Sequence, residues 1–255
     1  MKVVIFAGGQ GTRFQEETHK VPKPMIEIGG RPIIWHIMKN YAYFGFTDFI
    51  ILAGYKQEYI KDYFYNYHLH NSNVKISLTG DKEIQFYDEI SEDWNVTVLD
   101  TGLYATTGER LLKAKDFIWN DTFLLTYGDG VSDINIETLI DFHSKNDSIV
   151  TMTSVQPMGK YGNVIIDDYN SVIKYEEKPE SEDTWINGGF FVADKSIFDC
   201  LEENDFSNTL KLLSVNDSLS AYRYKGFWKS MDTLSDKLIL EDLWKTKKYP
   251  WKLWK

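Results

Sequence analysis

Short apolar runs alternate with longer amphipathic stretches through the first 145 residues of this chain. The apolar runs are typical of buried strands and lie within residues 3–9, 48–54, 95–102 and 122–130. The stretches between them have helical spacing and lie at residues 31–45, 56–67, 107–117 and 135–146. Such alternation predicts a mostly parallel sheet with helices on both faces. We therefore expect a doubly wound, Rossmann-like α/β fold.

The pattern changes after residue 145. Strand-like segments then dominate, at residues 148–155, 161–167, 171–178, 188–195 and 220–227. They predict a β-rich extension that makes the sheet mixed, rather than a second independent fold. Residues 232–248 return to helical spacing, and no Pro/Ser-rich linker or repeat interrupts the chain. We expect a single domain over residues 1–255, with parts at 1–145, 146–230 and 231–255.

The composition excludes several classes of protein. With 38 acidic and 28 basic residues, the formal charge is -10, which opposes a general phosphate-backbone footprint for nucleic acid. Cys200 is the only cysteine, which favours a reducing compartment and excludes an internal disulfide framework. No apolar run approaches the length of a membrane span or of a signal-peptide core. We expect a soluble cytoplasmic protein of enzyme size.

A glycine-rich loop follows the first apolar run. Gly8, Gly9 and Gly11 come directly after Ala7, at the first strand-to-helix turn, where open α/β sheets bind phosphates. Glycines there expose successive N–H groups that can cradle an anion. The spacing matches neither the dinucleotide fingerprint nor the P-loop, so a tight turn without a ligand is the alternative.

Two cations accompany the loop. Arg13 presents a planar fork of donors that suits phosphate oxygens, and Lys23 is a point charge between Pro22 and Pro24. The prolines stiffen the segment that carries Lys23. Together with the glycine loop, these residues predict a site for a phosphorylated ligand.

Two distant aspartates are the candidate metal ligands. Asp129 ends a predicted core strand, and Asp232 precedes the C-terminal helix, for which a cap is the alternative role. We expect Asp133 to cap the helix that follows it. His68 and His70 could face one metal from a strand, but we expect them to be an ordinary surface pair. Mg²⁺ takes one or two protein carboxylates plus phosphates and waters, so Asp129 and Asp232 suffice if they converge.

Residues 8–39 resemble the signature of the sugar-1-phosphate nucleotidyltransferases, which is Gly-Gly-x-Gly-Thr-Arg, a short interval, then Pro-Lys-Pro. Within that superfamily, the segments at 91–102, 126–143, 186–192, 226–237 and 250–254 are similar to those of the glucose-1-phosphate cytidylyltransferases. The resemblance covers nearly the whole chain. It implies the nucleotide-diphospho-sugar transferase fold, in which residues 1–145 bind the nucleotide and residues 146–230 bind the sugar.

The resemblance also implies a reaction. CTP and α-D-glucose 1-phosphate would give CDP-glucose and pyrophosphate with Mg²⁺, for nucleotide-sugar and surface polysaccharide biosynthesis. The attacking phosphate is already an anion at pH 7, so the chemistry needs charge neutralisation and no general base. The implied catalytic residues are Arg13, Lys23 and Asp129, and the implied metal ligands are Asp129 and Asp232.

The resemblance assigns two further sets of residues. The nucleotide-binding set is Ala7, Gly8, Gly9, Gly11, Thr12, Arg13, Lys23, Thr107, Arg110, Gly128 and Asp129. The sugar phosphate-binding set is Gly162, Glu177, Lys178, Asn187 and Gly188. From the residues alone, Thr107 is equally a helix start, and Glu177 with Lys178 is equally a solvated strand end.

One segment departs from the cytidylyltransferase pattern. Residues 203–217 replace a Trp-Glu-x-Glu-Pro-Leu segment beside the sugar site, and Asn208 and Thr209 stand where the acidic step belongs. A different phosphorylated acceptor, or UTP or dTTP as donor, is therefore the main alternative. A catalytically silent regulatory subunit is a second alternative, although Lys23, Asp129 and Asp232 are all present.

Aromatic residues crowd two short segments. Residues 59–70 and 249–255 are rich in Tyr, Phe and Trp, which predicts self-association. The family resemblance implies a homo-oligomer, with a hexamer as one candidate.

Overall fold

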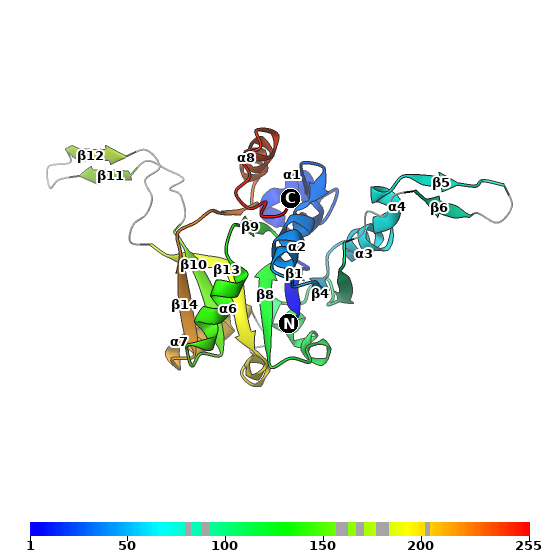
Figure 1. Cartoon of the computed structure of the whole chain (residues 1–255). Helices are drawn as coiled ribbons and strands as arrows, with labels where there is room; N and C mark the ends of the chain where they lie inside the picture. Colours follow the sequence, from blue (N-terminus) through cyan, green and yellow to red (C-terminus); the bar gives the residue numbers. More distant parts are fainter. Residues whose placement is uncertain (80–82, 88–91, 157–162, 167–170, 177–183, 202–204) are drawn as a thin grey trace.

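A mixed, mostly parallel sheet forms the centre of the computed structural model, which describes residues 1–79, 83–87, 92–156, 163–166, 171–176, 184–201 and 205–255. Among these residues, seven strands pair in the order β14-β10-β13-β8-β1-β4-β7 (Figure 1). β13 runs antiparallel to both of its neighbours, and the other pairs are parallel. The strands are β1 (Val3–Ala7), β4 (Asp48–Ala53), β7 (Asn95–Asp100), β8 (Thr122–Tyr127), β10 (Val150–Val155), β13 (Ile186–Asp194) and β14 (Leu219–Tyr224). The predicted fold class is confirmed.

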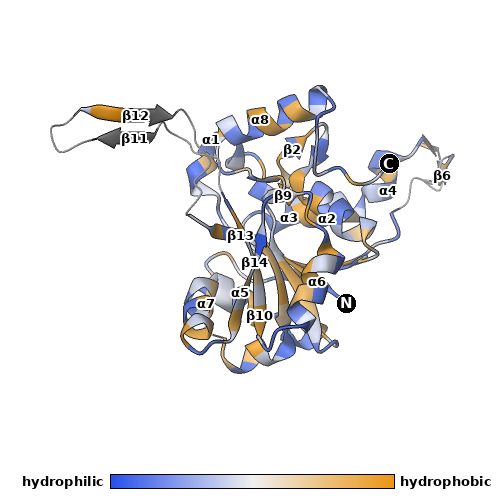
Figure 2. Cartoon of the chain, turned by 60° about the vertical axis from the view of Figure 1, so that its left-hand side comes forward, coloured by the Kyte–Doolittle hydropathy of each residue, from blue (hydrophilic) through white to orange (hydrophobic). Residues whose placement is uncertain are grey.

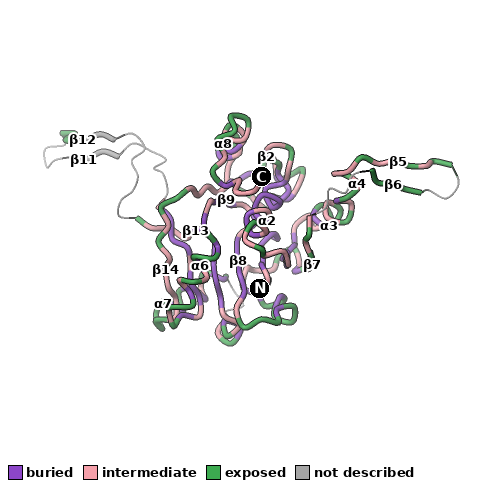
Figure 3. The backbone as a smooth tube through the Cα atoms, viewed as in Figure 1, coloured by how far each residue is buried: buried purple, intermediate pink, exposed green. Residues whose placement is uncertain are grey.

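Helices pack on both faces of this sheet, and Figure 2 shows the apolar residues along its strands. One hydrophobic cluster takes side chains from α2 (Ile33–Tyr43), α3 (Gln57–Tyr65), α6 (Ile136–Ser144) and α8 (Leu234–Lys245), and the other takes side chains from α5 (Thr107–Leu112) and α7 (Phe206–Val215). β1 shows why both faces are needed. Val3 and Ile5 enter one hydrophobic cluster while Val4 and Phe6 enter the other, as strand periodicity requires. The buried residues are therefore concentrated along the strands of the central sheet, as the purple segments in Figure 3 show.

The strand-rich part after residue 145 divides between the sheet and a hairpin. β10, β13 and β14 join the central sheet, whereas β11 (Asn163–Ile166) and β12 (Val172–Glu176) form a separate two-stranded pair among the described residues. A second hairpin, β5 (Val74–Ile76) with β6 (Ile84–Phe86), was not anticipated from the sequence. The two hairpins extend from opposite sides of the molecule (Figure 1).

Short elements complete the fold. The 3-10 turns are η1 (Thr12–Phe14), η2 (Lys23–Met25), η3 (Lys115–Phe117) and η4 (Lys195–Asp199), and the short helices are α1 (Gln15–Thr18) and α4 (Tyr67–Asn71). Two further strand pairs are β2 (Glu27–Ile28) with β3 (Arg31–Pro32), and β9 (Gly130–Ser132) with β15 (Trp228–Ser230). The predicted helix at 56–67 is thus divided between α3 and α4.

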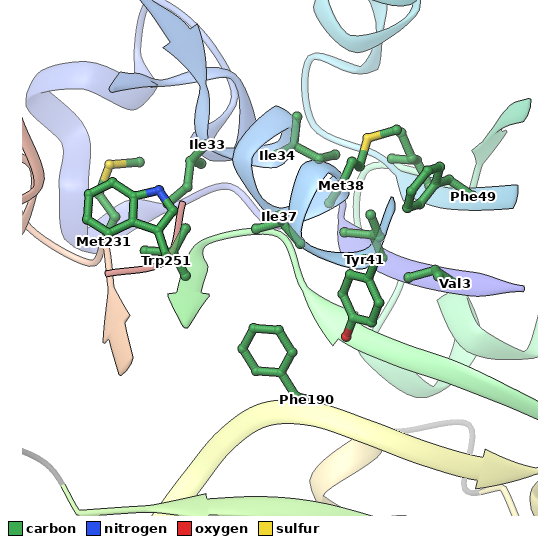
Figure 4. Close-up of a cluster of buried hydrophobic side chains, with 14 of the residues drawn as sticks. Val3, Ile33, Ile34, Ile37, Met38, Tyr41, Phe49, Phe190, Met231 and Trp251 are labelled. Atoms are coloured by element: carbon green, nitrogen blue, oxygen red, sulfur yellow. The ribbon is translucent and has the colours of Figure 1, made fainter. Parts of the chain in front are cut away.

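The C-terminal tail packs into the core, where Trp251 is fully buried beside α2 and Met231 (Figure 4). The indole of Trp251 donates to His36 Nδ1 at 3.4 Å, and His36 Nε2 donates to the carbonyl of Ile28 at 2.9 Å. Burial lowers the pKa of His36 to about 4, so its ring is neutral at pH 7. No helix in the described residues is long and apolar enough to cross a membrane.

Candidate active site

The glycine loop lies at the carboxyl end of β1 and has a shape that its neighbours fix. Gly11 has φ +60°, and a Cβ there would lie 2.7 Å from Thr18 Cγ2. The Thr18 hydroxyl donates to the carbonyls of Gly11 at 3.1 Å and Phe14 at 3.0 Å, which holds the loop onto η1 and α1. Gly9 is exposed and has open space where a side chain would project. A ligand can therefore reach the loop backbone near Gly9.

Arg110 lies beneath the loop rather than on its exposed side. Its side chain is buried, and a Cβ at Gly8 would collide with the guanidinium. The guanidinium donates to the Thr101 hydroxyl, to the Gly102 carbonyl at 2.9 Å and to the Leu103 carbonyl at 3.4 Å. Burial lowers the pKa of Arg110. The Arg110 guanidinium therefore holds the segment that follows β7 by hydrogen bonds to Thr101, Gly102 and Leu103. Its contact with a nucleotide stays a prediction.

Lys23 joins the two candidate metal ligands. Its Nζ donates to Asp129 Oδ2 at 2.6 Å and to Asp232 Oδ1 at 2.7 Å, across 106 and 209 residues of sequence. The short β9–β15 pair explains the convergence, because it aligns Ser230 with Gly130 and lets Met231 N donate to the Asp129 carbonyl at 2.8 Å. The two aspartates thus flank one strand pair and point at one cation.

The charges in this cluster stabilise one another. Burial alone would lower the pKa of Lys23, but Asp129 and Asp232 more than offset it, so the pKa is raised. Burial alone would raise the pKa of Asp232, yet Lys23, the hydroxyl of Ser230 and the charge of Arg13 bring it below its usual value. At pH 7 the ammonium of Lys23 and the carboxylate of Asp232 are therefore both charged.

The residue that caps α8 is Thr233, so a cap role for Asp232 is wrong. The Thr233 hydroxyl accepts from Asp236 N at 3.2 Å, and Asp236 Oδ2 accepts from Thr233 N at 3.0 Å, which forms a capping box. The same Asp236 carboxylate accepts from Asp232 N at 3.2 Å and pairs with Lys229. The Asp232 carboxylate does not cap the helix and instead accepts hydrogen bonds from Lys23 and Ser230.

The predicted cap of α6 is also wrong. Asn135 caps that helix, since its side chain accepts from Thr138 N at 2.9 Å, and Asp133 instead accepts from the Tyr224 hydroxyl. Asn135 lies directly before the helix, and its short amide suits the same backbone bond as well as an aspartate does. His68 and His70 lie on the helix α4 rather than on a strand, and both are exposed, as expected of a surface pair.

An open cavity of about 180 Å³ lies between the loop and the charged cluster, and its walls are formed by Gly11, Thr12, Arg13, Phe14, Lys23, Asp129 and Asp232. Arg13 is exposed at its edge, so two cations and two carboxylates face one space. In the described part of the chain, no three His, Cys, Asp or Glu side chains gather as a metal site. The carboxylates of Asp129 and Asp232, which now share the ammonium of Lys23, nevertheless suit Mg²⁺. That ion takes one or two protein carboxylates and completes its coordination shell with phosphates and waters.

The other predicted nucleotide residues lie around the same strand ends. Gly128 follows β8, and its N donates to the Phe6 carbonyl at 2.9 Å, while Ala7 ends β1 in the core. Thr107 begins α5, and its hydroxyl donates to Asp205 Oδ1 at 2.7 Å and accepts from Phe206 N at 2.8 Å. Thr107 therefore joins α5 to α7 in this structure.

Two predicted sugar residues lie at the start of β13. Asn187 Oδ1 accepts from Gly189 N at 2.9 Å, and its amide donates to the Tyr127 hydroxyl at 3.5 Å. The Gly188 carbonyl accepts from Trp228 Nε1 at 2.6 Å. Gly162, Glu177 and Lys178 lie outside the described residues.

Several residues that shape the site escaped the sequence reasoning. Thr18, Ser230 and Asp236 hold the loop and Asp232, and Tyr127 and Trp228 contact the start of β13. Thr233-x-x-Asp236 has capping-box spacing, so that pair was open to recognition. The bonds of Thr18 to Gly11 and of Ser230 to Asp232 are local but follow no recognised motif, whereas the contacts of Tyr127 and Trp228 with the start of β13 join distant segments and leave no local signal.

Comparison with known proteins places this geometry in a family. The Nucleotidyl transferase family model matches residues 2–229. Glucose-1-phosphate cytidylyltransferase of Salmonella typhi is 45% identical, and a probable glucose-1-phosphate cytidylyltransferase of Bacillus subtilis is 42% identical, with 100% of each chain covered.

Solved structures share the fold at lower identity. HddC from Yersinia pseudotuberculosis has a TM-score of 0.69 at 23% identity, and covers 95% of this chain and 99% of its own. A UDP-glucose pyrophosphorylase complexed with UDP-glucose has a TM-score of 0.69 at 18% identity, with 96% and 98% covered. Because the family model matches residues 2–229 and the cytidylyltransferases match the full length, this protein belongs to the nucleotidyl transferase family and, within it, to the glucose-1-phosphate cytidylyltransferases.

Proposed function

We propose that this enzyme transfers a cytidylyl group from CTP to α-D-glucose 1-phosphate and releases pyrophosphate. The observation that carries the proposal is the bridge from Lys23 to Asp129 and Asp232 beside the glycine loop. Full-length identity of 45% to a glucose-1-phosphate cytidylyltransferase supports both the donor and the acceptor. It also favours this function over another acceptor or a catalytically silent subunit.

The proposed chemistry follows from the charges of the two reactants. An oxygen of the sugar phosphate attacks the α-phosphorus of CTP while pyrophosphate leaves from the opposite side. Because the nucleophile is already an anion, the protein must neutralise repulsion rather than remove a proton. We assign the exposed N–H groups near Gly9 and the guanidinium of Arg13 to the β- and γ-phosphates, and Lys23 to the α-phosphate.

We assign Asp129 and Asp232 as the protein ligands of Mg²⁺. When bound there, the ion supplies positive charge that polarises the phosphoryl oxygens of the nucleotide. Before substrate binds, the ammonium of Lys23 holds the two carboxylates together, at 2.6 and 2.7 Å. We infer that Lys23 turns from the aspartates toward the α-phosphate when the triphosphate enters, because a charged phosphate oxygen accepts a hydrogen bond from an ammonium as a carboxylate does.

The acceptor half of the proposal rests on the start of β13. Asn187 and Gly188 would line the sugar pocket, together with Gly162, Glu177 and Lys178. Burial raises the pKa of Tyr127 to about 12, so its hydroxyl stays neutral beside Asn187 and can hydrogen-bond a sugar. In the divergent segment, Thr209 is fully buried on α7, whereas Asn208 is half-buried. Asn208 is therefore the better candidate of the two for contact with a ligand.

Three further expectations complete the proposal. Exposed apolar residues on the β5–β6 hairpin, such as Leu78 and Tyr87, fit a homo-oligomer, for which a hexamer is one candidate. The single cysteine fits a reducing, cytoplasmic location. The product class fits nucleotide-sugar and surface polysaccharide biosynthesis.

A substrate panel tests the proposal. Pyrophosphate release is measured for CTP, UTP, dTTP, ATP and GTP with glucose 1-phosphate, and then for CTP with other sugar 1-phosphates. We expect kcat/KM to favour CTP by at least about tenfold, roughly 1.4 kcal/mol of transition-state binding, because a wrong base leaves polar groups unpaired. If CTP is preferred but glucose 1-phosphate is inert while another acceptor reacts, the acceptor assignment is wrong and the donor assignment stands.

A further inference from the structure

One face of α8 contacts α1, which follows Arg13 in the chain, and the turn at Gly29, which follows Lys23. Lys237, Glu241 and Trp244 follow one another at i, i+4 and i+7, so they share that face. Lys237 Nζ pairs with Glu17 Oε2 on α1 at 2.9 Å. Glu241 Oε1 accepts from Gly29 N at 3.0 Å.

The turn at Gly29 is closely surrounded by aromatic side chains. Gly29 has φ +60°, and the indole of Trp244 lies where a Cβ of residue 29 would project. His36 holds the preceding carbonyl, that of Ile28, at 2.9 Å and packs edge-on against Trp244, with 4.9 Å between ring centroids. The turn is thus held by three side chains: the Glu241 carboxylate accepts from Gly29 N, the Trp244 indole packs against Gly29, and the His36 ring donates to the Ile28 carbonyl.

Backbone hydrogen bonds connect this turn to the segment that carries Lys23. The N of Ile26 donates to the Lys23 carbonyl at 3.1 Å, and the N of Ile33 donates to the Ile26 carbonyl at 2.9 Å, so η2 and the β2–β3 turn form one hydrogen-bonded unit. Ile26 and Ile28 are buried, which prevents this unit from sliding without loss of packing. A shift of the turn at Gly29 is therefore passed on to Lys23.

The same helix fixes Asp232 at its other end. Asp236, in the first turn of α8, accepts from Asp232 N at 3.2 Å. A helix rises about 1.5 Å per residue and is stiff over three turns, so α8 sets the separation between Asp232 and the turn at Gly29.

We propose that Glu241 is a positioning residue for Lys23, which acts through the N–H of Gly29 and keeps the ammonium in register with Asp232. Glu241 is not among the residues that line the catalytic cavity, and its carboxylate accepts from Gly29 N instead. The inference rests on the proposed function, because it assigns Glu241 to the turnover that Lys23 supports. A misplacement of about 1 Å in a catalytic group can cost roughly 10²-fold in rate, so even a partial shift is measurable.

The test compares Glu241→Ala with two matched variants. Glu241→Gln keeps an oxygen that can accept from Gly29 N–H, and Asp242→Ala removes the neighbouring, exposed carboxylate of the same helix. With CTP and glucose 1-phosphate, we expect Glu241→Ala to lower kcat by about tenfold while KM for CTP changes by less than about twofold. Glu241→Gln should recover most of the loss, and Asp242→Ala should match the wild type.

Two further measurements separate positioning from general stability. In single-turnover assays on the Lys23→Ala background, Glu241→Ala should have no additional effect, because its target is already gone. Amide exchange in residues 23–31, followed by mass spectrometry on the protein without substrate, should accelerate in Glu241→Ala and remain slow in Asp242→Ala. Unchanged exchange, or an equal loss of rate on both backgrounds, overturns the inference. An inactive wild-type enzyme overturns the proposed function instead, and the exchange comparison still decides whether Glu241 holds the segment.

Discussion

Replacing Lys23 by alanine should abolish most turnover while leaving the fold intact. Lys23 Nζ lies at 2.6 and 2.7 Å from the carboxylates of Asp129 and Asp232, and its side chain is 14% exposed. Loss of one preorganised donor at a developing charge costs on the order of 3 kcal/mol, or roughly 10²-fold in kcat. The side chains of Asp129 and Asp232 are 29% and 32% exposed, so water can solvate them once the ammonium is gone. The free energy of unfolding should therefore fall by about 2 kcal/mol, between the values for exposed and for buried ion pairs.

The same variant should bind Mg²⁺ more tightly in the absence of nucleotide. In the wild type the ammonium of Lys23 competes for both carboxylates, and its removal leaves Asp129 and Asp232 free to share a divalent cation. Isothermal titration calorimetry with MgCl₂, paired with steady-state pyrophosphate release, measures both effects, and Lys20→Ala serves as the exposed control. A folded Lys23→Ala enzyme with kcat within about threefold of the wild type, or with weaker Mg²⁺ binding, would refute the assignment.

The remaining predictions concern Asp232 and His36. Asp232→Asn should lose most activity, and raised Mg²⁺ should restore it only in part. Thr233→Ala should keep its kinetics but lower the free energy of unfolding by about 1 kcal/mol, as loss of a helix cap does. Turnover and thermal melting of the two variants measure these effects. Burial lowers the pKa of His36 from 6.5 to about 4, so between these values the unfolded chain binds the extra proton and the free energy of unfolding must rise with pH. Urea unfolding at pH 4.5 and pH 7 should show this dependence, of order 3 kcal/mol at most, and a smaller one in His36→Gln; an equal dependence in both would remove His36 as its cause.

Local sequence patterns were sufficient for the sheet and for the loop. Val3–Ala7 is apolar at every position because the strand is buried on both faces, and that condition is visible in five residues. The glycines after it and the prolines around Lys23 restrict the backbone locally, so their positions could be inferred without knowing the fold. No helix is predicted over residues 206–215, where α7 lies, although the Asp205 side chain caps it by accepting from Ser207 N.

Tertiary structure alone decided which charges meet. Asp129 and Asp232 converge because Ser230 pairs with Gly130 across about a hundred residues, and such pairing leaves no periodic signal in either segment. Thr233 rather than Asp232 caps α8, because its capping box with Asp236 satisfies the first N–H groups of the helix. The Asp232 carboxylate is therefore available to pair with Lys23. Trp251 likewise gives no sign in the sequence that it fills the core beside α2, because burial of a tail depends on the space that the other elements leave. Local backbone preference and hydrophobic period are properties of a few neighbouring residues, whereas the contacts that build this site depend on how distant segments pack together.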